Sequence, residues 1–226
     1  MKIKSAIKST RVLLPEGIKE AIVLIGEEKI IEVLSTIDYE IDVAITDVGD
    51  SVVMPGIIDP HVHINEPGRT EWEGFETATT AAAYGGITTL IEMPLNASPV
   101  TTTKNNFEIK LAAAKSKLNV NCGFWGGVVP NNYNYLEALL ERGVFGLKAF
   151  LTHSGIDDFP NTTAEQLRKA LLLLKKYNKP LLVHCELDAV HDDLKLLEQN
   201  PNSYDAYLKS RPKAWEPKYF LRMGQH

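Results

Sequence analysis

The stretch VVMPGIIDPHVH, residues 52–63, decides the fold. Its apolar run is typical of a buried strand, and a pair of histidines closes it. Because residues i and i+2 of a strand point to the same side, His61 and His63 would converge on one point. Neutral imidazole is a standard ligand for zinc and similar metals. The stretch therefore predicts a first strand that ends in a metal site.

Beyond this stretch, strand-like runs alternate with helical ones. Further strands are expected at 87–93, 120–125, 144–151 and 181–185, and helices at 73–84, 104–117, 133–142, 163–177 and, with a break at Pro201, 189–208. Alternation of this kind predicts a parallel sheet or barrel. A complete (β/α)8 barrel takes about 250 residues, more than follow residue 52, so about five units fit. The expected fold class is α/β, with a partial TIM-type (β/α)8 barrel of about strands 1–5 over residues 53–226.

Residues 1–52 form the other expected domain, which is small and rich in strands. The runs at 21–25 and 29–34 are separated by about three residues, a spacing that suits a hairpin. The segment 39–48 alternates more weakly. We expect a small β-sandwich-like unit that precedes the barrel.

Two later strand ends carry groups compatible with the same metal site. Lys148 lies in the apolar run GLKAFL, residues 146–151, and His184 follows the apolar run at 181–183. A buried lysine is costly unless its charge is neutralised or changed, although its amine can also extend to water from a strand end. Active sites of (β/α)8 barrels lie at the carboxyl ends of the strands. We therefore expect Lys148 and His184 to join the histidine pair.

Composition excludes several classes of function. The net charge of -5 argues against nucleic acid as a partner, because phosphate binding needs a basic surface. The apolar runs are far too short to span a membrane, and the N-terminus has no signal-peptide core. The two cysteines, Cys122 and Cys185, form no metal or redox spacing and are expected as half-buried core thiols. A cytoplasmic protein is the default expectation.

Four motifs resemble the amidohydrolase superfamily, in its cyclic-amidase branch. They are HVHINEPGRTEWEGF at 61–75, EMPLNASPVTT at 92–102, KAFLTHSGIDDFP at 148–160 and SRPKAWE at 210–216. Within this branch the motifs are most similar to those of the allantoinase family. A dihydroorotase would carry arginine two residues after the second histidine, where this chain has Asn65.

The resemblance implies a site with two divalent metal ions, with zinc as the default and manganese, cobalt or iron as alternatives. His61 and His63 would bind the more buried metal, His184 the more exposed one, and an N-carboxylated Lys148 would bridge both. Asn96 and Ser98 are candidate substrate-lining residues, with simple loop capping as the alternative. The implied reaction is hydrolysis of allantoin to allantoate in purine degradation, by a homotetramer.

The family pattern also includes a histidine on the sixth barrel strand and an aspartate on the eighth, which transfers protons. Neither has a counterpart here, so we expect a truncated chain whose catalytic acid/base lies beyond its end and which is poorly folded or inactive in isolation. The tail at 217–226 departs from the family pattern. Two other functions stay open, namely another cyclic amidase, such as a hydantoinase or dihydropyrimidinase, and a non-catalytic scaffold or assembly partner.

Overall fold

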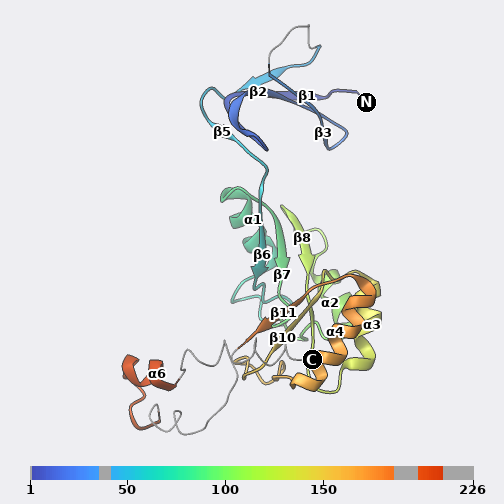
Figure 1. Ribbon diagram of the computed structural model, residues 1–226, viewed down its shortest axis with the longest axis vertical. Coiled ribbons are helices and arrows are strands. Elements are labelled where there is room, and N and C mark those ends of the chain that lie inside the picture. Colours follow the sequence, from blue (N-terminus) through green and yellow to red (C-terminus); the bar gives the residue numbers. More distant parts are fainter. Residues whose placement is uncertain (1, 36–41, 186–197, 211–226) are drawn as a thin grey trace. The chain divides into compact units, whose positions relative to one another are not determined.

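A computed structural model describes residues 2–35, 42–185 and 198–210, and the chain divides into two compact units, Met1–Gly56 and Ile57–His226 (Figure 1). Residues 189–197 of the helix expected at 189–208, the motif residues 211–216 and the tail at 217–226 lie outside the described residues. In the described remainder of that range, α6 (Tyr204–Ser210) begins after Pro201, where the break was expected. In the part that the structure describes, no helix is long and apolar enough to cross a membrane.

The first unit contains a five-stranded mixed sheet. Its strands are β1 (Ser5–Leu14), β2 (Gly17–Gly26), β3 (Lys29–Leu34), β4 (Ile45–Asp47) and β5 (Val52–Val53). They lie in the order β3-β2-β1-β4, and β5 pairs with β1. Strands β2 and β3 pair antiparallel, which confirms the expected hairpin. The sandwich-like arrangement expected for this unit stays a prediction.

Strand β2 supplies apolar side chains to two clusters, as the period of two along a strand requires. Ile22 and Leu24 pack with Ala6, whereas Ala21 and Val23 pack with Val12. Strand β1 was not expected as a ten-residue strand, because Lys8, Ser9, Thr10 and Arg11 interrupt its apolar pattern.

The second unit alternates parallel strands and helices. Its elements are β6 (Ile57–Val62), α1 (Phe75–Tyr84), β7 (Ile87–Glu92), α2 (Lys104–Ala114), β8 (Asn121–Phe124), β9 (Gly126–Gly127), α3 (Tyr133–Arg142), β10 (Leu147–Phe150), α4 (Ala164–Tyr177), β11 (Leu181–His184) and α6 (Tyr204–Ser210). Parallel pairing gives the orders β6-β7-β8 and β9-β10-β11. Only Trp125 separates β8 from β9. This α/β arrangement is consistent with part of a TIM barrel, and the number of barrel strands stays a prediction.

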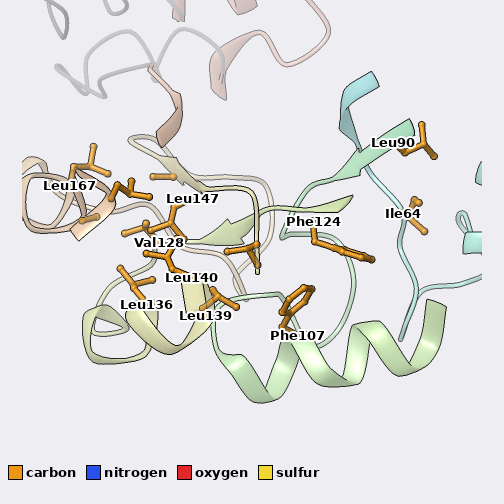
Figure 2. Packing of buried hydrophobic residues seen from close by; sticks show 14 of the residues in the cluster. Ile64, Leu90, Phe107, Phe124, Val128, Leu136, Leu139, Leu140, Leu147 and Leu167 are labelled. Atoms are coloured by element: carbon orange, nitrogen blue, oxygen red, sulfur yellow. The ribbon is translucent and has the colours of Figure 1, made fainter. Parts of the chain in front are cut away.

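The strands of the second unit have two different faces. One face packs in the large core cluster that also contains buried residues of helices α1 to α4 (Figure 2), including Leu90 of β7, Phe124 of β8 and Leu147 of β10. Phe124 meets Phe107 of α2 edge to face, with ring centroids 5.4 Å apart. The alternate residues form a second cluster that contains Ile91, Trp125 and Phe150.

Helix ends follow local capping chemistry. Thr163 and Gln166 form a capping box at the start of α4, and Asn178 ends the helix in a left-handed conformation. Gly143 ends α3 at a φ of 113°, which glycine adopts without strain. These signals explain why the expected boundaries of α3 and α4 lie within one residue of the observed ones.

Candidate metal centre

The strand pleat places the four candidate ligands on one face of the second unit. Along β6 and the residues after it, Val62 and Ile64 pack in the helix-side cluster. His61 and His63 alternate with them and therefore belong to the opposite face. Along β11 the same alternation separates Val183, on the helix side, from Leu182, which packs in the second cluster. His184 shares the register of Leu182 and so the same face.

His61 and His63 lie next to each other at the end of β6. Their ring centroids are 5.4 Å apart and their planes are tilted by 51°. Burial lowers the pKa of His61, the charge of Lys148 lowers it further, and Asp59 partly opposes the shift. Burial also lowers the pKa of His63, and the electrostatic effects of His61 and Lys148 lower it further. Both shifts favour the neutral ring, which is the form that binds a metal.

Lys148 lies in β10 between Gly127 of β9 and Leu182 of β11 in the strand register. Its relative exposure is only 5%, and burial lowers its pKa. Its Nζ lies 4.9 Å from the centroid of the Phe150 ring, and the same ring stacks on His184 at 5.0 Å and 12°. Phe150 thus connects the lysine and the histidine of neighbouring strands.

The donor set fits a metal site that includes a modified lysine. Within the described ranges, no three His, Cys, Asp or Glu side chains are grouped closely enough to hold a metal ion. Nor does any carboxylate among those residues form an ion pair with Lys148. A buried amine with a lowered pKa and no counter-charge is the form that can add CO2 to become an anionic carbamate. Carboxylation would therefore supply the oxygen donors that the imidazoles lack.

The two candidate substrate residues follow β7. The side chain of Asn96 approaches His63, with 3.3 Å between Nδ2 and Nδ1. Asn96 has a φ of 77°, in the left-handed region that is unfavourable for most residues other than glycine. Ser98 is exposed, and its backbone N–H donates to the carbonyl of Pro67 at 2.8 Å. Asn96 therefore contacts His63, whereas Ser98 joins the loop after β7 to the loop after β6.

Several residues next to this site were not singled out from the sequence. Glu92, on the helix side of β7, pairs with Lys110 of α2 at 2.6 Å, and both side chains are 0% exposed. Arg69 contacts the backbone of Asn96. The period of two could have placed Phe150 beside Lys148, but the partners of Glu92 and Arg69 lie 18 and 27 residues away in the sequence. No local pattern reveals contacts over such separations.

The two cysteines lie on the helix side of their strands and form no disulfide. Cys122 and Cys185 are both partly buried and pack against the helix-side cluster, as expected for core thiols. Burial raises the pKa of Cys122 to about 12, so this thiol stays protonated.

Comparison with known proteins yields one family and a consistent set of relatives. The sequence model of the amidohydrolase family matches residues 52–206. The allantoinase of Arabidopsis thaliana is 44% identical over 220 residues, which are 93% of this chain and 43% of that protein. The probable allantoinase of Oryza sativa subsp. japonica is 52% identical over 177 residues, 76% of this chain and 35% of that protein.

Among solved structures, the L-hydantoinase (dihydropyrimidinase) from Arthrobacter aurescens is similar to this chain, with a TM-score of 0.88 and 28% sequence identity. The alignment covers 98% of this chain and 50% of the hydantoinase chain. This chain therefore spans about half, or less, of the length of the proteins it matches.

Proposed function

Because the chain belongs to the amidohydrolase family, we propose that the protein takes part in hydrolysing the cyclic amide bond of allantoin to give allantoate, with two divalent metal ions, zinc by default. The observation that carries the proposal is the shared face of His61, His63, Lys148 and His184, with Lys148 buried and without a carboxylate partner in the described chain. The names of the relatives supply the choice of allantoin as substrate.

The residues of the chain would share the work as follows. The neutral rings of His61 and His63 hold one metal, and His184, whose ring is held by stacking on Phe150, contributes to the other. The ammonium of Lys148 would first lose a proton, and the neutral amine would then add CO2 and release a second proton. The resulting carbamate would offer two oxygen donors to the metal site. When bound, the metals supply an acidified water as nucleophile and polarise the amide carbonyl. Asn96 and Ser98 are proposed to line the substrate side.

The carbamate can be tested without measuring activity. Protein prepared with ¹³C-bicarbonate should give a carbamate carbon signal, and K148A should lose both this signal and the bound metal, measured by elemental analysis. H61N should keep the folded state but lose metal. H153N is the matched control, because the His153 side chain is 58% exposed. A K148A protein with wild-type metal content would contradict the assignment.

Substrate choice needs a separate assay. Metal-loaded protein is titrated separately with allantoin, hydantoin and dihydrouracil, because binding does not need the acid/base that the chain is expected to lack, and allantoin should bind most tightly. Preference for hydantoin would support the alternative of a hydantoinase, which the structural likeness favours. A protein that holds metal but binds none of the three would support a non-catalytic scaffold.

We also propose a homotetramer that works in the cytoplasm on a small molecule and binds neither nucleic acid nor membrane. Family resemblance supports the tetramer, and the net charge of -5 supports the absence of nucleic acid. Light scattering after size-exclusion chromatography tests the assembly. Cell fractionation tests the location, and recovery in mitochondria, as the name of the Aquarana catesbeiana allantoinase states for that relative, would contradict it.

A further inference from the structure

The loop after β6 and the loop after β7 are joined closely through backbone contacts. The N–H of Ser98 donates to the carbonyl of Pro67 at 2.8 Å. Gly68 has a φ of 90°, and a Cβ at this position would lie 2.5 Å from the carbonyl oxygen of Ser98. Only glycine therefore permits this close approach. Residues 66–69 and 96–98 form one packed assembly, which we call the two-loop contact.

Arg69 is the charged member of the two-loop contact. Its Nη1 donates to the carbonyl of Asn96 at 2.6 Å, and its side chain is 24% exposed. Its Nη2 lies 3.4 Å from Oδ2 of Asp158 in the loop after β10, and its guanidinium lies 5.4 Å from the ring of Trp72. The short contact with Asn96 is the better hydrogen bond, because the carboxylate of Asp158 is more distant and its side chain is 54% exposed.

Asn96 receives this hydrogen bond in a conformation that needs support. A non-glycine residue at a φ of 77° persists where its surroundings hold it. The conformation directs the side chain of Asn96 toward His63, where its carboxamide lies 3.3 Å from Nδ1. One ring nitrogen of His63 therefore faces protein groups.

We propose that Arg69 is a positioning residue that acts through Asn96 on His63. By holding the backbone of Asn96, Arg69 keeps the carboxamide against Nδ1 of His63, which leaves Nε2 to bind metal. A metal on Nε2 requires the proton on Nδ1, so the carboxamide presents its oxygen to that proton. The atom of Asn96 next to Nδ1 is Nδ2. Because the oxygen and nitrogen ends of a carboxamide have nearly the same shape, half a turn of this group brings Oδ1 to the same place.

This inference rests on the proposed metal site, but its first test needs no metal. Two-bond ¹H–¹⁵N correlation spectra report which imidazole nitrogen carries the proton, and H63N assigns the signal of His63. At pH 8 in metal-free protein, His63 of the wild type should carry its proton on Nδ1. R69M and N96L should both shift the population toward the Nε2–H form. D158N is the matched control, because it removes the distant partner of Arg69 and keeps the contact with Asn96.

The second readout is metal affinity. Loss of a residue that orients a metal ligand typically weakens metal binding about 10- to 100-fold. R69M and N96L should therefore bind zinc about tenfold more weakly than wild type. N96D should retain zinc binding, because its carboxylate accepts from Nδ1–H of His63. The control D158N should differ from wild type in zinc affinity by less than about twofold. If R69M does not fold, R69K serves instead, since one ammonium cannot reproduce the planar geometry of the guanidinium.

The outcomes separate this inference from the proposed function. If R69M and D158N give the same His63 spectrum, or if N96L changes it and R69M does not, Arg69 does not act through Asn96. If the tautomer shifts but zinc binding is unchanged, the positioning role is wrong. If the wild type binds no zinc at all, the proposed function fails, and the metal-free spectra still decide whether Arg69 controls His63.

Discussion

The buried pair of Glu92 and Lys110 gives the sharpest test of the energetics of this fold. Both side chains are 0% exposed, Nζ and Oε2 are 2.6 Å apart, and Lys110 also lies 3.5 Å from the carbonyl of Met93. The other carboxylate oxygen, Oε1, is buried without a hydrogen-bond partner among the residues described. Burial raises the pKa of Glu92 to about 7 from its ordinary 4.5, against the lowering effect of Lys110.

Removal of the lysine in K110M should have a cost that depends on pH. One unit of pKa difference between the folded and unfolded states corresponds to about 1.4 kcal/mol. The rise from 4.5 to about 7 therefore makes the folded state about 3 kcal/mol more stable at acid pH than at a pH above 7. Because the folded pKa is the higher one, this contribution is complete below pH 4.5 and is lost as the pH rises through about 7. Without Lys110, the folded pKa of Glu92 rises further.

The expected free energies differ at the two ends of this range. At pH 8, K110M must either bury an unpaired carboxylate or bind a proton on Glu92 far above its ordinary pKa of 4.5, and should lose about 3–5 kcal/mol of unfolding free energy. At pH 5 the carboxyl of Glu92 is protonated, and the loss should be about 1 kcal/mol, the value of one hydrogen bond. Urea denaturation followed by circular dichroism measures both values. E92Q/K110M, which carries no buried charge, should vary little with pH and be more stable than K110M at pH 8.

A K110M protein that loses the same free energy at pH 5 and pH 8 would refute the reasoning, because the charge of Glu92 would then have no part in the cost. The same holds if E92Q/K110M is less stable than K110M at pH 8. In that case packing, and not the unpaired charge, would dominate.

Two further predictions concern local geometry. G146A should lose about 1–3 kcal/mol of unfolding free energy, because the new Cβ would lie 2.3 Å from the carbonyl oxygen of Pro180. G85A is its control, since its nearest atoms would lie 3.5 Å away, and equal losses in urea denaturation would contradict the argument. T163A should lose about 1 kcal/mol, because it removes the side-chain oxygen that caps α4. An unchanged urea midpoint for T163A would show that the N-cap contributes nothing.

The sequence predicted elements best where local chemistry defines their ends. Helix α3 matches its expected range because Gly143 ends it, and α4 matches because Thr163 caps it. Strand β9 was not expected, because Gly126 and Gly127 have low strand propensity. Neither glycine leaves room for a Cβ, since Leu139 would lie 2.6 Å from one and Phe159 2.4 Å from the other. Tertiary packing therefore decides this strand.

The shared face of the candidate ligands could be predicted from the sequence, whereas the residues that contact them could not. A strand period of two is a local property, so His61 and His63 could be paired from the sequence alone. Whether Asn96 contacts His63 depends on a left-handed backbone conformation and on Arg69, 27 residues away. The assignment of metal ligands itself stays a prediction, which the K148A experiment tests.

The alternation along β10 has a consequence for how substitutions are tolerated. Leu147 and Ala149 pack in the helix-side cluster, whereas Lys148 and Phe150 belong to the opposite face. Substitutions of the first pair should reduce the amount of protein that accumulates in cells, because they disturb the core. Conservative substitutions of the second pair should leave abundance closer to normal and reduce turnover. A library of variants, sorted once for abundance and once for growth on the substrate, should therefore show two sensitivity profiles that alternate from one residue to the next.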